Sequence, residues 1–257
     1  MKIRPAHPPE NMSPPADDPM RKHPDAPEFG RIGRRGFLGV ALGGTALAGL
    51  GGNAQAAKDV APLEEVNPEY FNPAEWAMVL ALCDILIPAD GEGPGALEAR
   101  VPVFIDLQLA GDWGAARRWY MEGPHQPDAD PLQGYQTPLT PSEIYRQGLA
   151  HFNDWCSHMH NAAFADLASD ARHEAVAALM NEKTNLPAQL RDFPDFLLQN
   201  VKEGYLSDPR HGGNHGMAAW AYIGYPGARA NFPSWTNPER DEAHYPLGPV
   251  DIAGERV

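Results

Sequence analysis

The stretch that decides the fold lies in the middle of the chain, where residues 140–159 read TPSEIYRQGLAHFNDWCSHM. Thr140 suits a helix N-cap, Pro141 suits the first helical position, and Glu143 completes a capping-box pattern. This start signal predicts a long helix, which continues through a series of apolar residues: Ile144, Tyr145, Leu149, Phe152, Trp155, Cys156, Met159 and Ala163.

The same cap pattern occurs earlier in the chain, at Asn72-Pro73-Ala74-Glu75. Pro88 and the glycine-rich run 90–95 end the helix predicted there. Its apolar residues fall mostly on one helical stripe: Trp76, Val79, Leu80, Cys83, Ile85, Leu86 and Ile87.

Three further helices are predicted from apolar patterning. One spans residues 101–110 and is expected to resume over 115–121 after two glycines. Another is predicted near 170–180 with Ser169 as its N-cap, and a last one over about 193–206.

The remaining segments are rich in proline and glycine. Residues 123–138 are expected to form a loop, and residues 207–257 have no helical or strand period. No convincing alternating strand is present. The sequence therefore predicts an all-α domain of about five helices, with long Pro/Gly-rich loops and an extended, irregular C-terminal tail.

Composition limits the function classes. Of 257 residues, 43% are hydrophobic, which is enough for one domain or two small ones with a real core. The net charge of −14 argues against a nucleic-acid binder, which needs a basic surface. Two cysteines cannot build a disulfide-rich miniature fold or a metal site made of cysteines alone.

The first 30 residues are proline-rich and nearly free of large apolar side chains, so we expect them to be disordered. They make a longer extension than export leaders usually need, and Met12 and Met20 are alternative starts.

An export signal is predicted next. Arg34 and Arg35 stand directly before Phe37 and Leu38, and residues 36–57 contain no charge. Seven glycines make this run only weakly apolar, so it resembles a twin-arginine signal peptide. The alternative is an uncleaved membrane anchor, because 22 uncharged residues can span a bilayer.

The uncharged run ends in Ala54-Gln55-Ala56, which predicts cleavage after Ala56. We therefore divide the chain into a leader, 1–56, and a single mature domain, 57–257. The mature chain keeps 13 basic and 29 acidic residues, a net charge of −16, and is expected in the periplasm.

The twin-arginine route carries proteins that have already folded, usually around a cofactor or with a bound partner. The mature sequence has no haem-attachment motif, no four-cysteine cluster set and no phosphate-binding glycine loop. Either the chain folds around a group that its sequence does not indicate, or it accompanies a cofactor-containing partner that lacks a signal.

Other chemistry is weakly indicated. Cys83 and Cys156 could form a disulfide after export, or they are two small buried apolar residues. His151 and His158 lie seven residues apart on one predicted helix face. They could bind a metal ion, or they are surface histidines with no such role. No Gly-x-Ser-x-Gly hydrolase motif is present.

The densest unusual signal is a glycine- and aromatic-rich segment, 203–229. Aromatics and arginine on rigid turns are typical of interface hot spots, and the alternative is a loop that packs on its own helices. The candidate partner-contact residues are Tyr205, Asp208, Trp220, Tyr225, Pro226 and Arg229.

Together with other parts of the chain, this segment resembles a known family. The twin-arginine leader, the runs 203–214 and 224–229, Trp220 and the closing run 245–250 are similar to the small (gamma) subunit of membrane-bound gluconate 2-dehydrogenase, the subunit 3 family. The resemblance covers roughly 33–250. The resembling motifs indicate a small subunit of such a complex. They distinguish less well between a complex that oxidises gluconate and related complexes that oxidise fructose, sorbitol, glucose or 2-ketogluconate.

The resemblance implies a three-part oxidoreductase. A large FAD-containing flavoprotein oxidises D-gluconate to 2-keto-D-gluconate, and a multi-haem cytochrome c subunit passes the electrons to quinone and holds the complex on the membrane. The small subunit is implied to carry no catalytic, cofactor-binding or metal-binding residues. Its implied role is to help the flavoprotein fold and cross the membrane.

Two other hypotheses compete with this one. A self-sufficient secreted hydrolase would be active as a purified monomer. A structural protein held by an uncut leader would keep residues 1–56.

Overall fold

The computed structural model describes residues 60–229 and 248–256, all of which belong to one structural unit. The predicted leader, with its arginine pair and cleavage site, lies outside the described residues, as do residues 245–247 of the closing run 245–250. The α-helices are α2 (Pro73–Leu86), α3 (Val101–Ala110), α4 (Pro141–His160), α5 (Ser169–Met180), α6 (Phe193–Leu206) and α7 (Ala218–Tyr222).

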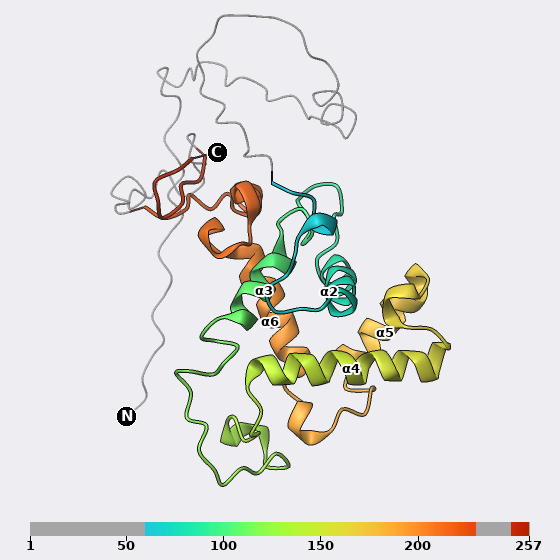
Figure 1. The fold of residues 1–257 in the computed structure, drawn as a ribbon. Coiled ribbons are helices and arrows are strands. Elements are labelled where there is room, and N and C mark those ends of the chain that lie inside the picture. Colours follow the sequence, from blue (N-terminus) through green and yellow to red (C-terminus); the bar gives the residue numbers. More distant parts are fainter. Residues whose placement is uncertain (1–59, 230–247, 257) are drawn as a thin grey trace, which may run out of the picture. The chain divides into compact units, whose positions relative to one another are not determined.

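The predicted all-α class is confirmed for the described part of the chain (Figure 1). No strand occurs there, and pairing is limited to isolated bridges that join Val250 to Gly227 and to Arg256. Short 3-10 turns connect the helices: Leu63–Glu65, Pro131–Gln133, Phe164–Asp166, Ala188–Leu190, Pro209–His211 and His215–Met217.

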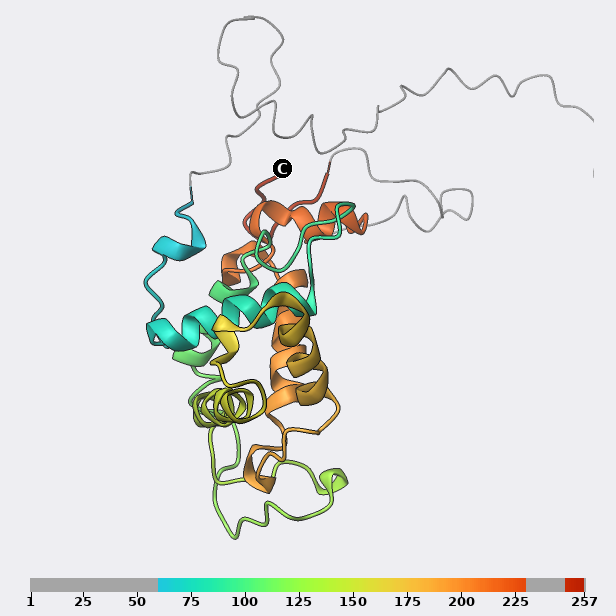
Figure 2. The ribbon, with the colours of Figure 1, turned by 90° about the vertical axis from the view of Figure 1, so that its right-hand side faces the viewer.

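Helix α6 is the centre of the packing, because it contacts α2, α3, α4, α5 and α7. Figure 2 shows α4 end on, with α5 and α6 running beside each other. The core between these helices is filled mainly by large side chains with no exposed surface: Tyr145, Phe152, Phe164, Phe193, Leu82, Ile105, Ile144, Leu149, Leu179 and Leu197.

A glycine inside α4 makes room for one of these side chains, the Phe193 ring. A Cβ at Gly148 would lie 2.4 Å from Cγ of Phe193, at the start of α6. Glycine is unfavourable in a helix interior, so its presence here is explained by the close approach of the aromatic ring.

Both predicted capping boxes are present. The Asn72 side chain accepts hydrogen bonds from the backbone N–H groups of Ala74 and Glu75, and Thr140 accepts one from Glu143. Each N3 glutamate accepts a hydrogen bond from the backbone N–H of its cap residue in return. These local signals fix where α2 and α4 begin.

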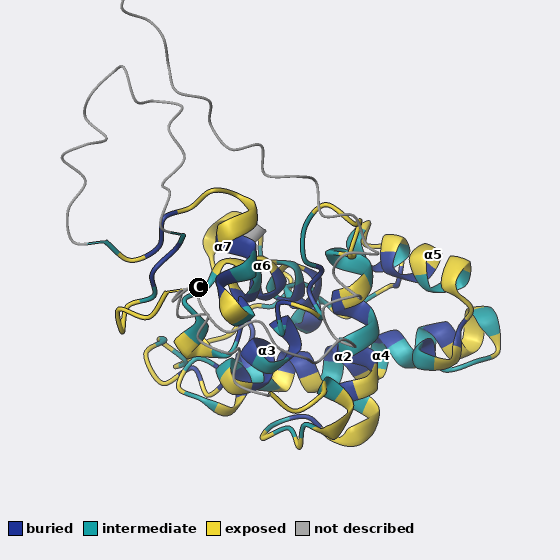
Figure 3. Ribbon diagram, turned by 90° about the horizontal axis from the view of Figure 1, so that it is seen from above, coloured by how far each residue is buried: buried dark blue, intermediate teal, exposed yellow. Residues whose placement is uncertain are grey.

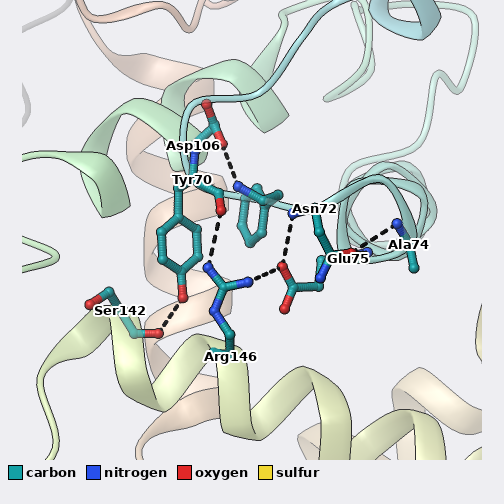
Figure 4. A network of polar contacts seen from close by, with 8 residues as sticks. Tyr70, Asn72, Ala74, Glu75, Asp106, Ser142 and Arg146 are labelled. Atoms are coloured by element: carbon teal, nitrogen blue, oxygen red, sulfur yellow. Dashed lines mark hydrogen bonds and ion pairs between the residues drawn. The ribbon is translucent and has the colours of Figure 1, made fainter.

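A polar network joins the two capped helix starts (Figure 4). Arg146 of α4 donates to the Glu75 carboxylate at 2.5 Å and to the Tyr70 carbonyl at 3.1 Å, and its guanidinium lies 4.3 Å from the centre of the Tyr70 ring. The Tyr70 hydroxyl donates to the Ser142 carbonyl, and burial raises its pKa to about 12.

Asp106 of α3 fixes the segment that leads into α2. Its carboxylate is 3% exposed and accepts hydrogen bonds from the backbone N–H groups of Glu69 at 2.7 Å, Tyr70 at 3.0 Å and Phe71 at 3.1 Å. A buried carboxylate with several N–H donors has its desolvation offset by charge-assisted hydrogen bonds. Asp106 is therefore a structural residue.

Two local predictions were wrong. Residues 115–121 form turns instead of a resumed helix, because the chain folds back against the end of α3: a Cβ at Gly114 would lie 1.9 Å from the Leu109 carbonyl oxygen, and Ala116 has a φ of 51°. Ser169 is the first residue of α5 and not its cap, and the cap residue Ala168 supplies no side-chain hydrogen bond.

The described part of 207–257 is more ordered in its secondary structure than predicted. It contains two 3-10 turns and α7, and the Gly227–Val250 bridge joins its two described pieces. The absence of a sequence period here reflects elements of three to five residues, which are too short to show one.

Candidate interaction surface

The C-terminal cap, defined as residues 204–229 and 248–256, is built on the end of α6 by close backbone packing. Figure 3 shows α7 beside α6 at this end of the described residues. A Cβ at Gly204 would lie 2.9 Å from the ring of Phe104 in α3, and one at Gly213 would lie 2.1 Å from the Gly204 carbonyl oxygen. Glycine at both positions lets α3, α6 and the following loop approach each other.

Side-chain hydrogen bonds hold the cap to α6. Asn214 is fully buried; its amide nitrogen donates to the Ser207 carbonyl at 2.9 Å, and its oxygen accepts from the Ala219 N–H at 3.0 Å. The Trp220 indole N–H donates to the Leu206 carbonyl at 2.8 Å. These bonds satisfy buried polar groups and position α7 against α6.

The last described residues are held to the same cap. Asp208 accepts hydrogen bonds from the Arg210 N–H at 3.1 Å and from the Ile252 N–H at 2.8 Å. A Cβ at Gly227 would lie 2.0 Å from the Val250 carbonyl oxygen, which accepts from the Ala228 N–H at 2.7 Å. The Gly227 position therefore requires glycine both for space and for its φ of 81°.

The six predicted contact residues all lie in this cap, with different exposure. Trp220 and Pro226 are buried, while Tyr205, Asp208 and Arg229 are half-buried. The Tyr205 hydroxyl donates to the Pro94 carbonyl at 2.8 Å, and burial raises its pKa. The structure thus shows that most of them pack within this chain, and their contact with a partner stays a prediction.

Tyr225 is the predicted contact residue with the largest exposed surface, 45%, and its ring packs edge-on against Trp220 at 5.0 Å. Sequence reasoning did not name the cap's other exposed large apolar residues as contact residues, because their exposure depends on contacts between distant segments: Leu206 at 46%, Tyr222 at 50%, Ile223 at 55% and Ile252 at 62%. Large exposed apolar side chains are a common feature of protein interfaces.

A groove runs along one side of the cap, between α3 and α6, and has a volume of about 590 Å³. We call it the α3–α6 groove. Phe104 is nearly buried in it, whereas most of the other lining side chains are polar and at least partly exposed. The lining residues are Phe104, Gln108, Gln199, Lys202, Glu203, Leu206, Ser207 and His211.

Cys83 and Cys156 are free thiols in the core, with no exposed surface. In this structure the two residues pack as small apolar groups, and their pairing in a disulfide after export stays a prediction. Burial raises the pKa of the Cys156 thiol to about 11 and that of Cys83 further. Neither thiol is arranged as a reactive nucleophile.

The histidines of α4 make separate contacts. His151 lies 3.0 Å from the Thr184 carbonyl, His158 lies 2.7 Å from the Asp154 carbonyl, and His160 packs edge-on against Trp155. Across residues 60–229 and 248–256, no three His, Cys, Asp or Glu side chains come together in a way that could hold a metal ion. Within the same residues, no helix has the length and apolar character needed to cross a bilayer.

Comparison with known proteins supports one family. The model of the family described as gluconate 2-dehydrogenase subunit 3 matches residues 73–227, which is more than half of the chain. Searches of curated proteins and of solved structures found no match. The matched region begins at the first residue of α2 and ends at Gly227 in the cap, so it includes all six α-helices of the described structure. The chain is thus a member of the gluconate 2-dehydrogenase subunit 3 family.

Proposed function

We propose that this chain is a non-catalytic subunit of a periplasmic, membrane-associated, FAD-dependent gluconate 2-dehydrogenase. In this proposal it helps the FAD-containing subunit to fold and accompanies it through the twin-arginine export route. Membership of a dehydrogenase subunit family already makes the chain a component of an oxidoreductase. The specific partners, the export route and the reaction are the proposed part.

The observation that carries the proposal is the extent of the family match. It continues past the helical core into the cap, through Trp220 and Gly227. The cap presents Tyr222, Ile223 and Tyr225 to solvent at 45–55% exposure. A subunit needs a surface of this kind to bury against another subunit, because aromatic side chains such as tyrosine are enriched among the residues that contribute most of the association energy.

In the proposed complex, oxidation takes place on the partner. FAD on the partner would supply the hydride acceptor for the oxidation of D-gluconate to 2-keto-D-gluconate, and the cytochrome c subunit would supply the path of the electrons to quinone. Three well-ordered polar side chains of this chain have structural roles instead: Asp106, Arg146 and Asn214 hold segments of the fold together.

The contribution of this chain would be thermodynamic. A partner that binds only the folded state of the flavoprotein stabilises that state by mass action, by about 2.7 kcal/mol at a hundredfold excess over the dissociation constant. A folded pair can then be exported with one signal. The arginine pair Arg34-Arg35 supplies that signal in the proposal.

Export is tested by replacing both arginines with lysine in the full-length chain, co-expressed with the FAD-containing subunit. We expect the flavoprotein to remain in the cytoplasm with the variant and to reach the periplasm with the unaltered chain. The control variant replaces Arg21 and Lys22, which lie before the signal, by glutamine and should leave export unchanged. A flavoprotein that reaches the periplasm with the lysine variant would refute carriage by this chain.

A further inference from the structure

The segment that precedes α2 is tied to the helices by polar contacts. We call residues 61–72 the N-terminal strap. Asp106 of α3 accepts hydrogen bonds from three consecutive backbone N–H groups of the strap, and Arg146 of α4 donates to the Tyr70 carbonyl (Figure 4). Phe71 lies in the core at 4% exposure. The second half of the strap is therefore an integral part of the fold.

The first residues of the strap have two anchors of their own. The Arg100 guanidinium donates to the Ala61 carbonyl at 2.8 Å, and the Trp76 indole N–H donates to the Leu63 carbonyl at 3.2 Å. Leu63 also packs against the hydrophobic core. Arg100 is the N-cap residue of α3 and Trp76 belongs to α2, so side chains of the folded domain hold the strap from Ala61 onward.

This anchoring leaves a short connection to the predicted cleavage site. Between the bond that follows Ala56 and the first anchored residue, Ala61, there are four residues, 57–60. Four residues span at most about 14 Å when fully extended. A peptidase that cuts after Ala56 must therefore work within that distance of the folded domain for as long as the strap is closed.

The start of the strap can open without release of its second half. Proteolysis acts on segments that are free of the fold, and cleavage beside a held segment follows the fraction of molecules in which that segment is open. Ala61 and Leu63 are held by one side-chain hydrogen bond each, whereas Asp106 makes three bonds to the residues beyond them. Local opening therefore begins at Ala61.

We propose that the leader is removed from molecules in which residues 61–63 have detached from Arg100 and Trp76, so that the strap sets the rate of processing. The step is hydrolysis: water adds across the Ala56–Ala57 peptide bond, which breaks to leave a carboxylate on Ala56 and an amino group on Ala57. This inference rests on the predicted cleavage site and needs no partner subunit. A folded chain thus keeps its export signal for as long as its strap is closed.

The test measures how fast a purified bacterial signal peptidase, which cuts after Ala-x-Ala sites, removes the leader from the full-length chain in detergent. Arg100→Met keeps a long side chain but removes the hydrogen bond to Ala61. It is expected to raise the rate about tenfold, the effect of losing one charge-assisted hydrogen bond. The matched control is Arg117→Met, because Arg117 pairs with Asp112 and not with the strap, and it should change the rate less than about twofold.

A second variant lengthens the connection. About ten Gly and Ser residues inserted between Val60 and Ala61 let the peptidase reach its bond while the strap is closed, and the rate is expected to rise at least about tenfold. In this longer chain Arg100→Met should have no further effect, because opening of the strap is no longer required. The insertion precedes the first anchored residue, so this measurement decides the question even if Arg100→Met fails to fold.

Three results would overturn the inference. If the insertion leaves the rate unchanged, opening of the strap does not limit processing. If the insertion raises the rate and a folded Arg100→Met variant does not, the length of the connection is limiting and the strap stays closed during cleavage. If no variant is cut, or if N-terminal sequencing of the product finds a first residue other than Ala57, the cut does not lie beside the strap. All three leave the proposed function standing, because that proposal is tested by the location of the flavoprotein.

Discussion

Single glycines decide how closely the cap approaches α6. We expect Gly213→Ala to lower the free energy of unfolding by roughly 2–3 kcal/mol, because its Cβ would meet the Gly204 carbonyl oxygen at 2.1 Å and the backbone must move. Chemical denaturation of the mature chain measures this loss.

Gly216→Ala is the matched control in the same cap. Gly216 has a φ of 61°, and a Cβ at this position would have no other atom within 4 Å, so alanine there meets only backbone strain of about 1 kcal/mol. Equal losses for the two variants would show that close packing of the cap on α6 contributes nothing specific to stability.

The two buried thiols are predicted to be unreactive in the folded protein. Burial raises the pKa of Cys156 to about 11, so at a pH of about 8 the thiolate is scarce and also inaccessible. Iodoacetamide at that pH should leave Cys83 and Cys156 unmodified in the folded chain and alkylate both in guanidinium without reductant, as mass spectrometry would show.

Alkylation that requires a reductant would instead reveal a Cys83–Cys156 disulfide and contradict the free thiols of this structure. Rapid alkylation of the folded chain would contradict their burial.

The raised pKa of Cys156 also predicts a pH dependence of stability. The folded state holds the thiol proton more tightly than the unfolded state, whose thiol has its ordinary pKa of 9.0. This contribution is complete below pH 9 and is lost as pH rises toward 11. Cys156→Ala should therefore show a smaller fall in the free energy of unfolding over this range than the unaltered chain. If the free energy of unfolding fell equally with pH in the two proteins, the raised pKa of Cys156 would be refuted.

At the scale of elements, Asp106 joins α3 to the segment before α2. Asp106→Asn replaces one acceptor oxygen by an NH₂ group that faces a backbone N–H, so at least one of the three hydrogen bonds is lost and a donor is left unpaired. We expect a loss of about 2 kcal/mol in the free energy of unfolding, measured by chemical denaturation.

Asp112→Asn is the control for this change. Asp112 pairs with Arg117 at 3.3 Å, and both side chains are more than half exposed, so the change should stay within about 0.5 kcal/mol. If Asp106→Asn is equally mild, the three N–H contacts do not hold α2 in place.

The elements that could be predicted from the sequence are those specified by adjacent residues. Asn72 and Thr140 lie beside the backbone groups that they cap, so the starts of α2 and α4 follow from four consecutive residues each. The turns at 115–121 could not be predicted, because they depend on the contact of Gly114 with the end of α3.

The candidate surface was predicted only in part, for the same reason. Glycine and aromatic enrichment located the cap, but the exposure of each residue depends on contacts between distant segments. Trp220 is buried because its indole reaches Leu206, whereas Ile223 and Ile252, which carry no distinctive motif, are exposed. The α3–α6 groove needs Phe104 and Leu206 together, residues that lie about a hundred positions apart.

At the scale of the whole molecule, an acidic chain of 257 residues presents exposed apolar side chains on its C-terminal cap. The family places this chain in a dehydrogenase as a subunit. In the proposed function this chain binds the FAD-containing subunit, and that subunit carries out the oxidation.

The most direct test of this proposal is purification of the untagged chain from its own host under mild conditions, followed by an assay of gluconate oxidation with an artificial electron acceptor. We predict that the chain emerges in a fixed ratio with an FAD-containing subunit and that it has no activity once separated from it. A chain that emerges alone and oxidises gluconate unaided would contradict the proposal.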